Sequence, residues 1–199
     1  MDERWLALEL AVTICHDGNG GVADELSTPM QLTAWLRDRA ELLEGCADPA
    51  FRADPAALSA VLSIRQAVRA LFARAVSPAP PSSADAHRLI PAEEALNRLN
   101  TAALRYPTSR QLFWDERESP QLRTVVPAPP ADPVGLLSAA LARSAIDLLG
   151  GPERESLRAC TAPRCVRYFL QGHGRQEFCK PSCSNRARAA RHYQRHHQS

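Results

Sequence analysis

The sequence predicts a mainly α-helical protein, with one β-hairpin in a helical N-terminal domain and a small cysteine-rich module at the C-terminus. Three observations predict this class. Apolar residues recur at three- and four-residue steps through most of residues 1–150. Several of these stretches begin with a capping residue followed by proline. Four cysteines lie close together in residues 151–199. A chain of 199 residues is long enough for one medium domain and a small appendage.

Five helices are expected in the N-terminal domain. Trp5–Ile14 fits both a helical and a two-residue period, and we favour a helix. A further helix should cover about residues 91–105. The other three have a capping side chain followed by proline at the first helical position, at Thr28-Pro29, Asp54-Pro55 and Asp132-Pro133.

Glycines and one β-prone region divide the remaining chain. Gly45 should end the helix that begins at Thr28. Two β-prone runs separated by a polar connection predict an antiparallel hairpin over about residues 109–126. Gly150-Gly151 follows the last apolar stripe, so we expect a helical domain over 1–150 and a second domain over 151–199.

The four cysteines have the spacing of metal ligands. Four residues separate Cys160 from Cys165, and three separate Cys179 from Cys183. Two such pairs can hold one tetrahedral zinc ion, in a structural site with no open position for chemistry. The alternatives are two disulfides or four unrelated thiols. The module is too small for a large core, so zinc should supply about 10 kcal/mol of its folding free energy.

The segments around the cysteines predict how this zinc module folds. Tyr168–Leu170 and Gln176–Phe178 flank a glycine-containing connection and should pair as a hairpin. Ser182 can cap a helix that carries Cys183 in its first turn and runs to about Gln194. The sequence therefore predicts a treble-clef-like zinc finger.

Charge is distributed unevenly along the chain. Residues 151–199 carry 10 Lys and Arg against 3 Asp and Glu, a net charge of +7, whereas residues 1–150 carry 14 against 19, a net charge of −5. An acidic body with a basic tail indicates a polyanionic partner at one end. A GC-rich genome would explain arginine in place of lysine, but not this clustering. The candidate nucleic-acid contacts are Lys180, Arg186, Arg188, Arg191 and Arg195.

One cation in the body lies on an apolar helix stripe. A buried cation needs a partner, so Arg65 could face an anionic ligand in a pocket lined by tryptophans. The alternatives are an ion pair with Glu9 or Asp38, or a side chain that reaches the surface. The candidate lining residues are Trp5, Trp35 and Trp114.

The sequence contains no recognisable catalytic motif. It has neither a phosphate-binding glycine loop nor a nucleophile elbow, so we expect no enzyme. His16 and Asp17 could form half of an acid–base pair, although adjacent turn residues more often face solvent. An acidic start, Met1-Asp2-Glu3, argues against a secretory signal, and Trp5–Ile14 is too short to span a membrane. We therefore expect a cytoplasmic protein.

Both ends of the chain resemble known families. Cys183–Arg186, followed by Arg188 and Arg191, resembles the signature of CGNR zinc fingers, with Ser184 in place of the glycine. Such fingers usually end bacterial proteins that begin with an ABATE domain, described as a stress-induced transcription regulator. Leu6–Thr13 and Asp24–Pro29 are similar to segments of that domain. The family has asparagine where this chain has Val12. If that asparagine helps to bind a ligand, the ligand of this protein differs or is absent. The neighbouring Thr13 is a further candidate ligand residue.

These observations predict a DNA-binding regulator with a structural zinc. Its body would sense a small molecule or pair with a partner. A homodimer would help specific binding, because one short basic helix buries little surface on DNA. The first alternative is a module that contacts protein or RNA without sequence specificity. The second is an enzyme in the N-terminal domain, which a cleft containing His16, Glu9 and Arg65 would favour.

Overall fold

The computed structural model describes residues 4–17, 21–43, 50–76, 84–115, 117, 119–126 and 132–197. The predicted helix end at Gly45 lies outside these residues. The elements, in chain order, are α1 Leu6–Ala11, β1 Ile14–His16, β2 Val22–Asp24, α2 Pro29–Arg37, η1 Ala40–Leu43, α3 Pro55–Ala75, η2 Ala86–Arg88, α4 Ala92–Arg105, β3 Ser109–Phe113, β4 Gln121–Val125, α5 Pro133–Gly150, η3 Pro152–Ser156, β5 Leu157–Ala159, β6 Tyr168–Leu170 and α6 Pro181–His197.

The three predicted cap–proline helix starts are confirmed. The Thr28 hydroxyl accepts a hydrogen bond from the Gln31 backbone N–H, and the Gln31 side chain completes the capping box. The carboxylates of Asp54 and Asp132 accept equivalent bonds at the starts of α3 and α5. Each bond satisfies a backbone N–H that the first helical turn leaves unpaired, so the sequence defines these starts locally.

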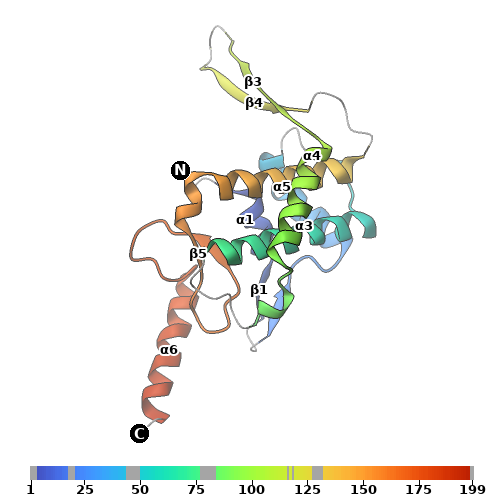
Figure 1. Ribbon diagram of the computed structural model, residues 1–199. Helices are drawn as coiled ribbons and strands as arrows, with labels where there is room; N and C mark the ends of the chain where they lie inside the picture. The colour runs from blue at the N-terminus through green and yellow to red at the C-terminus, as the bar shows by residue number, and fades with distance from the viewer. Residues whose placement is uncertain are drawn as a thin grey trace.

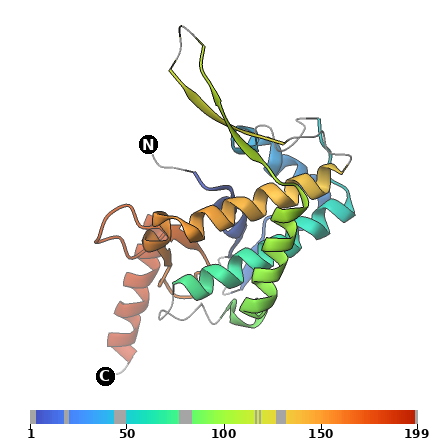
Figure 2. The ribbon, with the colours of Figure 1, turned by 45° about the horizontal axis from the view of Figure 1, so that its top comes forward.

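Helices α3, α4 and α5 pack against one another, and α1 packs on α3 and α5 (Figures 1 and 2). Long and apolar, α3 and α5 could span a membrane by length and composition alone, but 61% and 50% of their most apolar stretches are buried inside the protein. They are therefore the core helices of the bundle. The largest fully buried side chains include Leu10, Leu32, Val61, Phe72, Leu99, Leu137 and Leu148.

In the described residues, three two-stranded antiparallel sheets accompany the helices. The predicted hairpin is confirmed as β3–β4, which pairs Ser109 with Val125 through to Phe113 with Gln121. The sequence missed the β1–β2 pair. The segment with two periods is helical only over Leu6–Ala11, and Ile14 begins β1. The helical period therefore describes the start of the Trp5–Ile14 segment, and its end belongs to a strand.

The predicted pairing within the finger was wrong. Strand β6 pairs with β5, which precedes the first cysteine, and Gln176–Phe178 is not a strand. The Gln176 side chain instead accepts a hydrogen bond from the Gly172 N–H, and Phe178 packs against the cysteine cluster. Side-chain bonds close this turn, so its second arm has no need of a strand partner.

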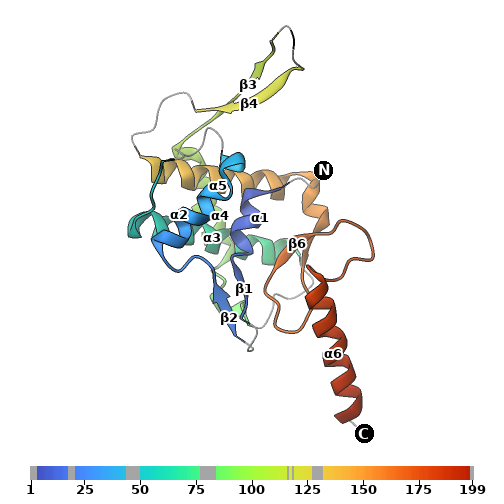
Figure 3. The ribbon, with the colours of Figure 1, turned by 180° about the vertical axis from the view of Figure 1, so that it is seen from behind.

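The finger packs on the helical body before its last helix leaves it. Leu157 of β5 and Tyr168 of β6 belong to the same buried cluster as the body helices. As predicted, α5 ends at Gly150, yet the apolar core continues past that point. The outer part of α6 then extends away from the body, on the side opposite the β3–β4 hairpin (Figures 1 and 3).

Candidate metal centre and nucleic-acid interface

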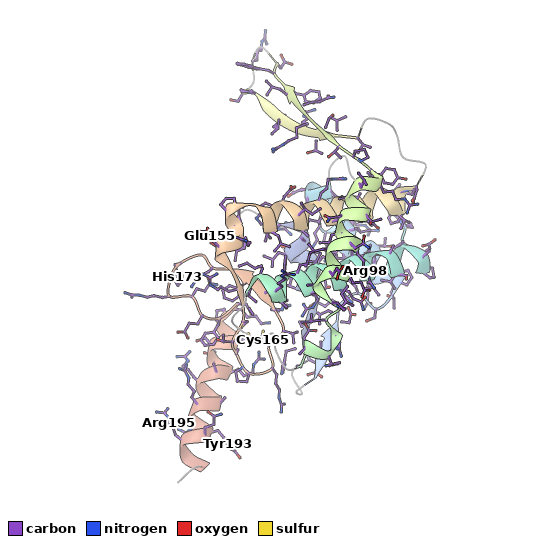
Figure 4. The ribbon with its side chains drawn as sticks, viewed as in Figure 1. Arg98, Glu155, Cys165, His173, Tyr193 and Arg195 are labelled. Carbon is purple, nitrogen blue, oxygen red and sulfur yellow. The ribbon has the colours of Figure 1, made fainter. Side chains whose placement is uncertain are left out.

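The four cysteines converge on one point. Cys160 follows β5, and Cys165 lies shortly before β6. Cys183 is in the first turn of α6, as predicted, but α6 begins at Pro181, so the predicted cap Ser182 lies inside the helix. With Cys179, their sulfur atoms all lie within 4.8 Å of one another. Figure 4 shows Cys165 in the part of the finger that lies between the body and the outer end of α6.

The sulfur separations fit a single tetrahedral metal ion. The Sγ atom of Cys183 lies 3.5 Å from that of Cys179 and 3.8 Å from that of Cys165, and the Sγ atoms of Cys165 and Cys179 are 3.9 Å apart. Zn–S bonds of about 2.3 Å in a regular tetrahedron give sulfur–sulfur distances of about 3.8 Å. A disulfide needs about 2.05 Å, and all four cysteines are free thiols. The cysteines therefore form a zinc site, and the disulfide alternative is excluded.

The ionisation of the thiols also requires a cation. Hydrogen bonds from the Cys165 and Cys179 thiols lower the pKa of Cys160 to about 2. The same bonds raise the pKa of Cys165 to about 11 and move the pKa of Cys179 in the same direction. Like charges at this distance oppose ionisation of one another, so a divalent cation is needed to hold Cys160, Cys165 and Cys179 as thiolates together.

The backbone of the first ligand turn is shaped for the metal. The Cys165 N–H donates to the Ala162 carbonyl at 2.9 Å, and Arg164 between them has a φ of 60°. This left-handed conformation is unusual for a residue other than glycine. The Cys179 N–H donates to the Cys160 sulfur at 3.5 Å. Such N–H···S bonds favour the thiolate form that binds zinc.

Arg186 lies at the metal centre, apart from the other predicted nucleic-acid residues. Its Nη2 donates to the Cys183 sulfur at 3.5 Å, and its Nε is buried without a hydrogen-bond partner. Four thiolates around Zn²⁺ carry a net charge of −2, which this guanidinium offsets. Its charge is therefore directed at the zinc ligands.

The other candidate cations are on the open surface. Lys180, Arg188, Arg191 and Arg195 are all exposed. The three arginines are separated by three and four residues and so share one side of the helix. From Arg188 to Arg195 every residue except Ala190 is exposed. Arg195 and Tyr193 lie on the outer end of α6 (Figure 4). This half of the helix contacts little of the protein.

Arg65 is held in an ion pair by its own chain. Its guanidinium donates to both carboxylate oxygens of Asp24, each at 2.6 Å, and to the Thr13 hydroxyl at 2.9 Å. The predicted partners were wrong, because Glu9 binds Arg39 instead, at 2.9 Å. Burial raises the pKa of Asp24, but hydrogen bonds from Arg65 and the Leu26 N–H lower it below its usual value. A structural pair thus occupies the predicted anion site.

The three tryptophans predicted to line a ligand pocket lie in different surroundings. Trp35 is buried beneath Arg39, whose guanidinium lies 4.6 Å from the ring centre. Trp114 is 69% exposed and follows β3 on the projecting hairpin. Trp5 is half-buried at the start of α1. Among the five predicted ligand residues, Arg65 and Thr13 are joined by a hydrogen bond.

Sequence reasoning missed Arg69, which joins the body to the finger. Its guanidinium donates to Asp85, to the Ala11 carbonyl at 2.5 Å and to the Val166 carbonyl at 2.8 Å. It also stacks on Tyr168, and both Arg69 and Asp85 are almost fully buried. Its position one turn after Arg65 on an apolar stripe was the available signal, since two buried cations need two sets of partners.

Comparison with protein families finds two matches. Residues 5–152 match the ABATE family, described as "Putative stress-induced transcription regulator", and residues 156–196 match the CGNR zinc finger. A search of curated proteins finds no similar sequence.

Proposed function

The chain belongs to the ABATE family and ends in a CGNR zinc finger, and from this premise we propose that it is a cytoplasmic bacterial transcription regulator that binds duplex DNA through α6. Neither matched family is an enzyme family. In the described residues, Glu9 and Arg65 serve separate ion pairs, which gives the enzyme alternative no support.

The observation that carries the proposal is the exposed basic half of α6. Arg188 to Arg195 span about 12 Å at 1.5 Å per residue. A helix with its side chains is about 10–12 Å across, and the major groove of B-DNA is about 12 Å wide. Because this half of α6 stands clear of the body (Figures 1 and 3), it can enter the groove without a clash.

The charge distribution also supports binding with the finger toward the DNA and the body away from it. The finger carries +7 and the body −5 by the counts given above. A phosphate backbone attracts the first and repels the second. Arg188, Arg191 and Arg195 are positioned for phosphates along one side of the groove, with Lys180 near the helix start. An arginine that reaches a guanine edge would add sequence preference.

Zinc has a structural role in this proposal. All four ligand positions are filled by cysteine, so the ion offers no site for a reacting group. Cys183 connects the ion to the first turn of α6, and Cys160 and Cys165 connect it to the strands packed on the body. The metal therefore sets the direction in which the basic helix leaves the body.

A salt titration of duplex binding tests this proposal. Three or four phosphate contacts predict that log affinity falls with log salt with a slope of about −3. Arg188→Gln with Arg191→Gln should make the slope shallower by about two and leave the zinc content unchanged. The matched control is Arg37→Gln with Arg74→Gln, which removes two exposed arginines from the body and should leave the slope unchanged.

The contrary outcomes are equally concrete. A wild-type protein that binds no duplex at low salt would overturn the DNA proposal in favour of a protein-contacting finger. Equal or tighter binding to single-stranded RNA, with the same loss in the α6 variant, would point to RNA.

For the sensing role of the body, a groove between α3, α4 and α5 is a better candidate than the Arg65 region. Its volume is about 380 Å³, and its lining includes Ser63, Arg98, Arg105, Asp132 and Ser138. This size is within the range that binds small ligands. Arg105 and Asp132 pair with each other at 3.3 Å, and both side chains are partly exposed, so a small zwitterion could bind both charges in exchange. Thermal-shift screening of amino acids, with Arg105→Gln as the variant that loses the response, tests this site.

A further inference from the structure

The β3–β4 hairpin carries a cluster of exposed apolar side chains. Four of the nine exposed large hydrophobic side chains in the described residues lie on its strands or directly after β3. They are Leu112, Phe113, Trp114 and Leu122. The hairpin projects from the body (Figures 1 and 3), and an isolated two-stranded hairpin is only marginally stable in water. Such a surface indicates an interaction site.

The strand register separates the hairpin into two different faces. Leu112 lies opposite Leu122, so these two side chains share a face. Trp114 directly follows the last residue of β3, and the strand alternation extended by one residue puts it on the same face. They are 65%, 57% and 69% exposed. On the other face, Phe113 is covered by Arg123, whose guanidinium lies 4.7 Å from the ring centre. The apolar face is therefore the uncovered one.

The order of residues along the apolar face is complementary to itself. Arg110 and its cross-strand partner Thr124 lie on this face at the end nearer the body, the leucine pair lies in the middle, and Trp114 lies at the far end. A second copy in antiparallel orientation would bring leucines onto leucines. The same arrangement would place each Trp114 beside the Arg110 of the other copy, where a cation–π contact is favourable.

The charges of the hairpin favour the same arrangement. Residues 109–125 carry three arginines and three acidic residues, so their net charge is zero. Arg110 and Arg123 lie on the strands, whereas Arg117 and all three acidic residues lie between the strands, where Asp115, Glu116 and Glu118 give the connection a net charge of −2. An antiparallel pair sets acidic ends against basic strands. A neutral surface gives no attraction for a phosphate backbone.

We propose that the apolar face of the β3–β4 hairpin binds the same face of a second copy of this chain, forming an antiparallel, two-fold symmetric dimer. In this dimer the leucine pairs form the centre and the Trp114–Arg110 contacts form the two ends. Three side chains of this kind bury roughly 400 Å² per copy, about half of a standard interface. The dimer is therefore a weak and reversible one, with a dissociation constant on the order of micromolar.

Sedimentation velocity of the full, zinc-loaded chain tests this proposal, and the assay contains no nucleic acid, so its result is independent of the DNA proposal. The wild-type sedimentation coefficient should rise with protein concentration across the micromolar range. Leu112→Glu with Leu122→Glu should stay monomeric at every concentration. The matched control, Ser109→Glu with Gln111→Glu, adds the same two charges to the other face and should still associate.

A second variant keeps the test open if glutamates disturb the hairpin. Arg110→Glu leaves both leucines in place and should weaken association at least tenfold by removing the contact with Trp114. Circular dichroism and zinc content, unchanged in every variant, confirm that the body and finger are folded. A wild-type chain that stays monomeric throughout, or a control that loses association as fully as the leucine variant, would overturn the proposal.

Discussion

The finger and the β3–β4 hairpin both contain a short antiparallel sheet, but they are stabilised in opposite ways. Strands β5 and β6 pair over only three positions, yet Leu157, Tyr168 and Phe169 are buried. Strands β3 and β4 pair over five positions, and nearly all of their residues are exposed. Pairing length therefore does not decide burial here. What decides it is whether the sheet has a metal and a core to pack on.

The finger owes its burial to contacts with the body as well as to zinc. Tyr168 packs edge-on against Phe72, with ring centres 5.6 Å apart, and Arg69 donates to the Val166 carbonyl. A surface ion pair joins Arg167 to Glu25 at 3.6 Å. The sequence predicted a helical domain over 1–150 and a second domain over 151–199. The continuous core predicts that damage to the finger reaches the body.

Zinc removal should cause the largest loss of stability, and it should act on the finger sheet and not on the β3–β4 hairpin. A strong chelator, or Cys183→Ser, should remove about 10 kcal/mol of folding free energy from the finger. Because Leu157 and Tyr168 then leave the shared core, the Tm of the body should fall as well. Hydrogen exchange and thermal melts measure both effects. The control is Cys15→Ser, outside the metal cluster; a body melt unchanged by chelation would show that the two parts fold independently.

Undocking the finger without touching the metal should have the next largest effect. Arg69→Met leaves Asp85 buried without its counter-charge, which should lower the free energy of unfolding by about 3–5 kcal/mol. Denaturant unfolding measures the loss, and the zinc content should stay at one ion per chain. Adding Asp85→Leu should restore part of the stability. The exposed Arg74 on the same helix gives the control, since Arg74→Met should change stability by less than about 0.5 kcal/mol.

A change beside the metal should weaken the finger more gently. Arg186→Gln removes the hydrogen bond to the Cys183 sulfur, and zinc affinity should fall by roughly 10- to 100-fold. Competition with a chromogenic chelator measures the affinity. Arg188→Gln, two residues along the helix, should leave zinc affinity unchanged. If the two variants behaved alike, Arg186 would belong with the surface cations after all.

The β1–β2 sheet gives a third case, because one ion pair ties it to α3. Arg65→Met should lower the free energy of unfolding by about 1–2 kcal/mol, an allowance that discounts the partial exposure of Asp24. The pKa of Asp24 is lowered in the folded state. Its contribution is therefore complete above the unfolded-state pKa of about 4, and it is lost as the pH falls below that value through the lowered pKa of the folded state.

Unfolding curves measured from neutral to acid pH test this contribution. They should be steeper with pH for the wild type than for Arg65→Met, while Arg37→Met should follow the wild type. A pH profile that Arg65→Met leaves intact would assign the acid sensitivity to other carboxylates.

Substitutions on the β3–β4 hairpin should change the stability of the chain least. At concentrations where the chain is monomeric, Leu112→Ala should change stability by less than about 0.5 kcal/mol, because Leu112 is already exposed. The same replacement in the finger sheet, Leu157→Ala, should cost about 2–5 kcal/mol. Thermal melts of both variants measure the contrast. Equal losses would mean that the hairpin leucine is buried in solution.

Local signals made much of this structure predictable. Cysteine spacing identified the zinc ligands, and capping residues followed by proline located three helix starts, because both depend on neighbours in the sequence. Pairings across long stretches were not predictable. Arg65 meets Asp24 across 41 positions and Arg69 meets Val166 across 97. Strand β5 contains a single buried leucine in three residues, too little pattern to indicate its partner. Arg186 lies within a basic run that is typical of a solvated surface, so nothing in the sequence indicated that its side chain faces the zinc ligands.

The placement of α6 and the β3–β4 hairpin at opposite ends of the body (Figures 1 and 3) has a consequence for any pair of copies joined at the hairpins. Their basic helices would point outward at the two extremes of the assembly, too far apart to share adjacent half-sites. In such a dimer each basic helix would bind a separate segment of DNA. Binding of one helix to a duplex would raise the effective concentration of the other helix near distant segments of the same molecule. It would therefore favour DNA loops or bridges over the occupation of a compact palindrome.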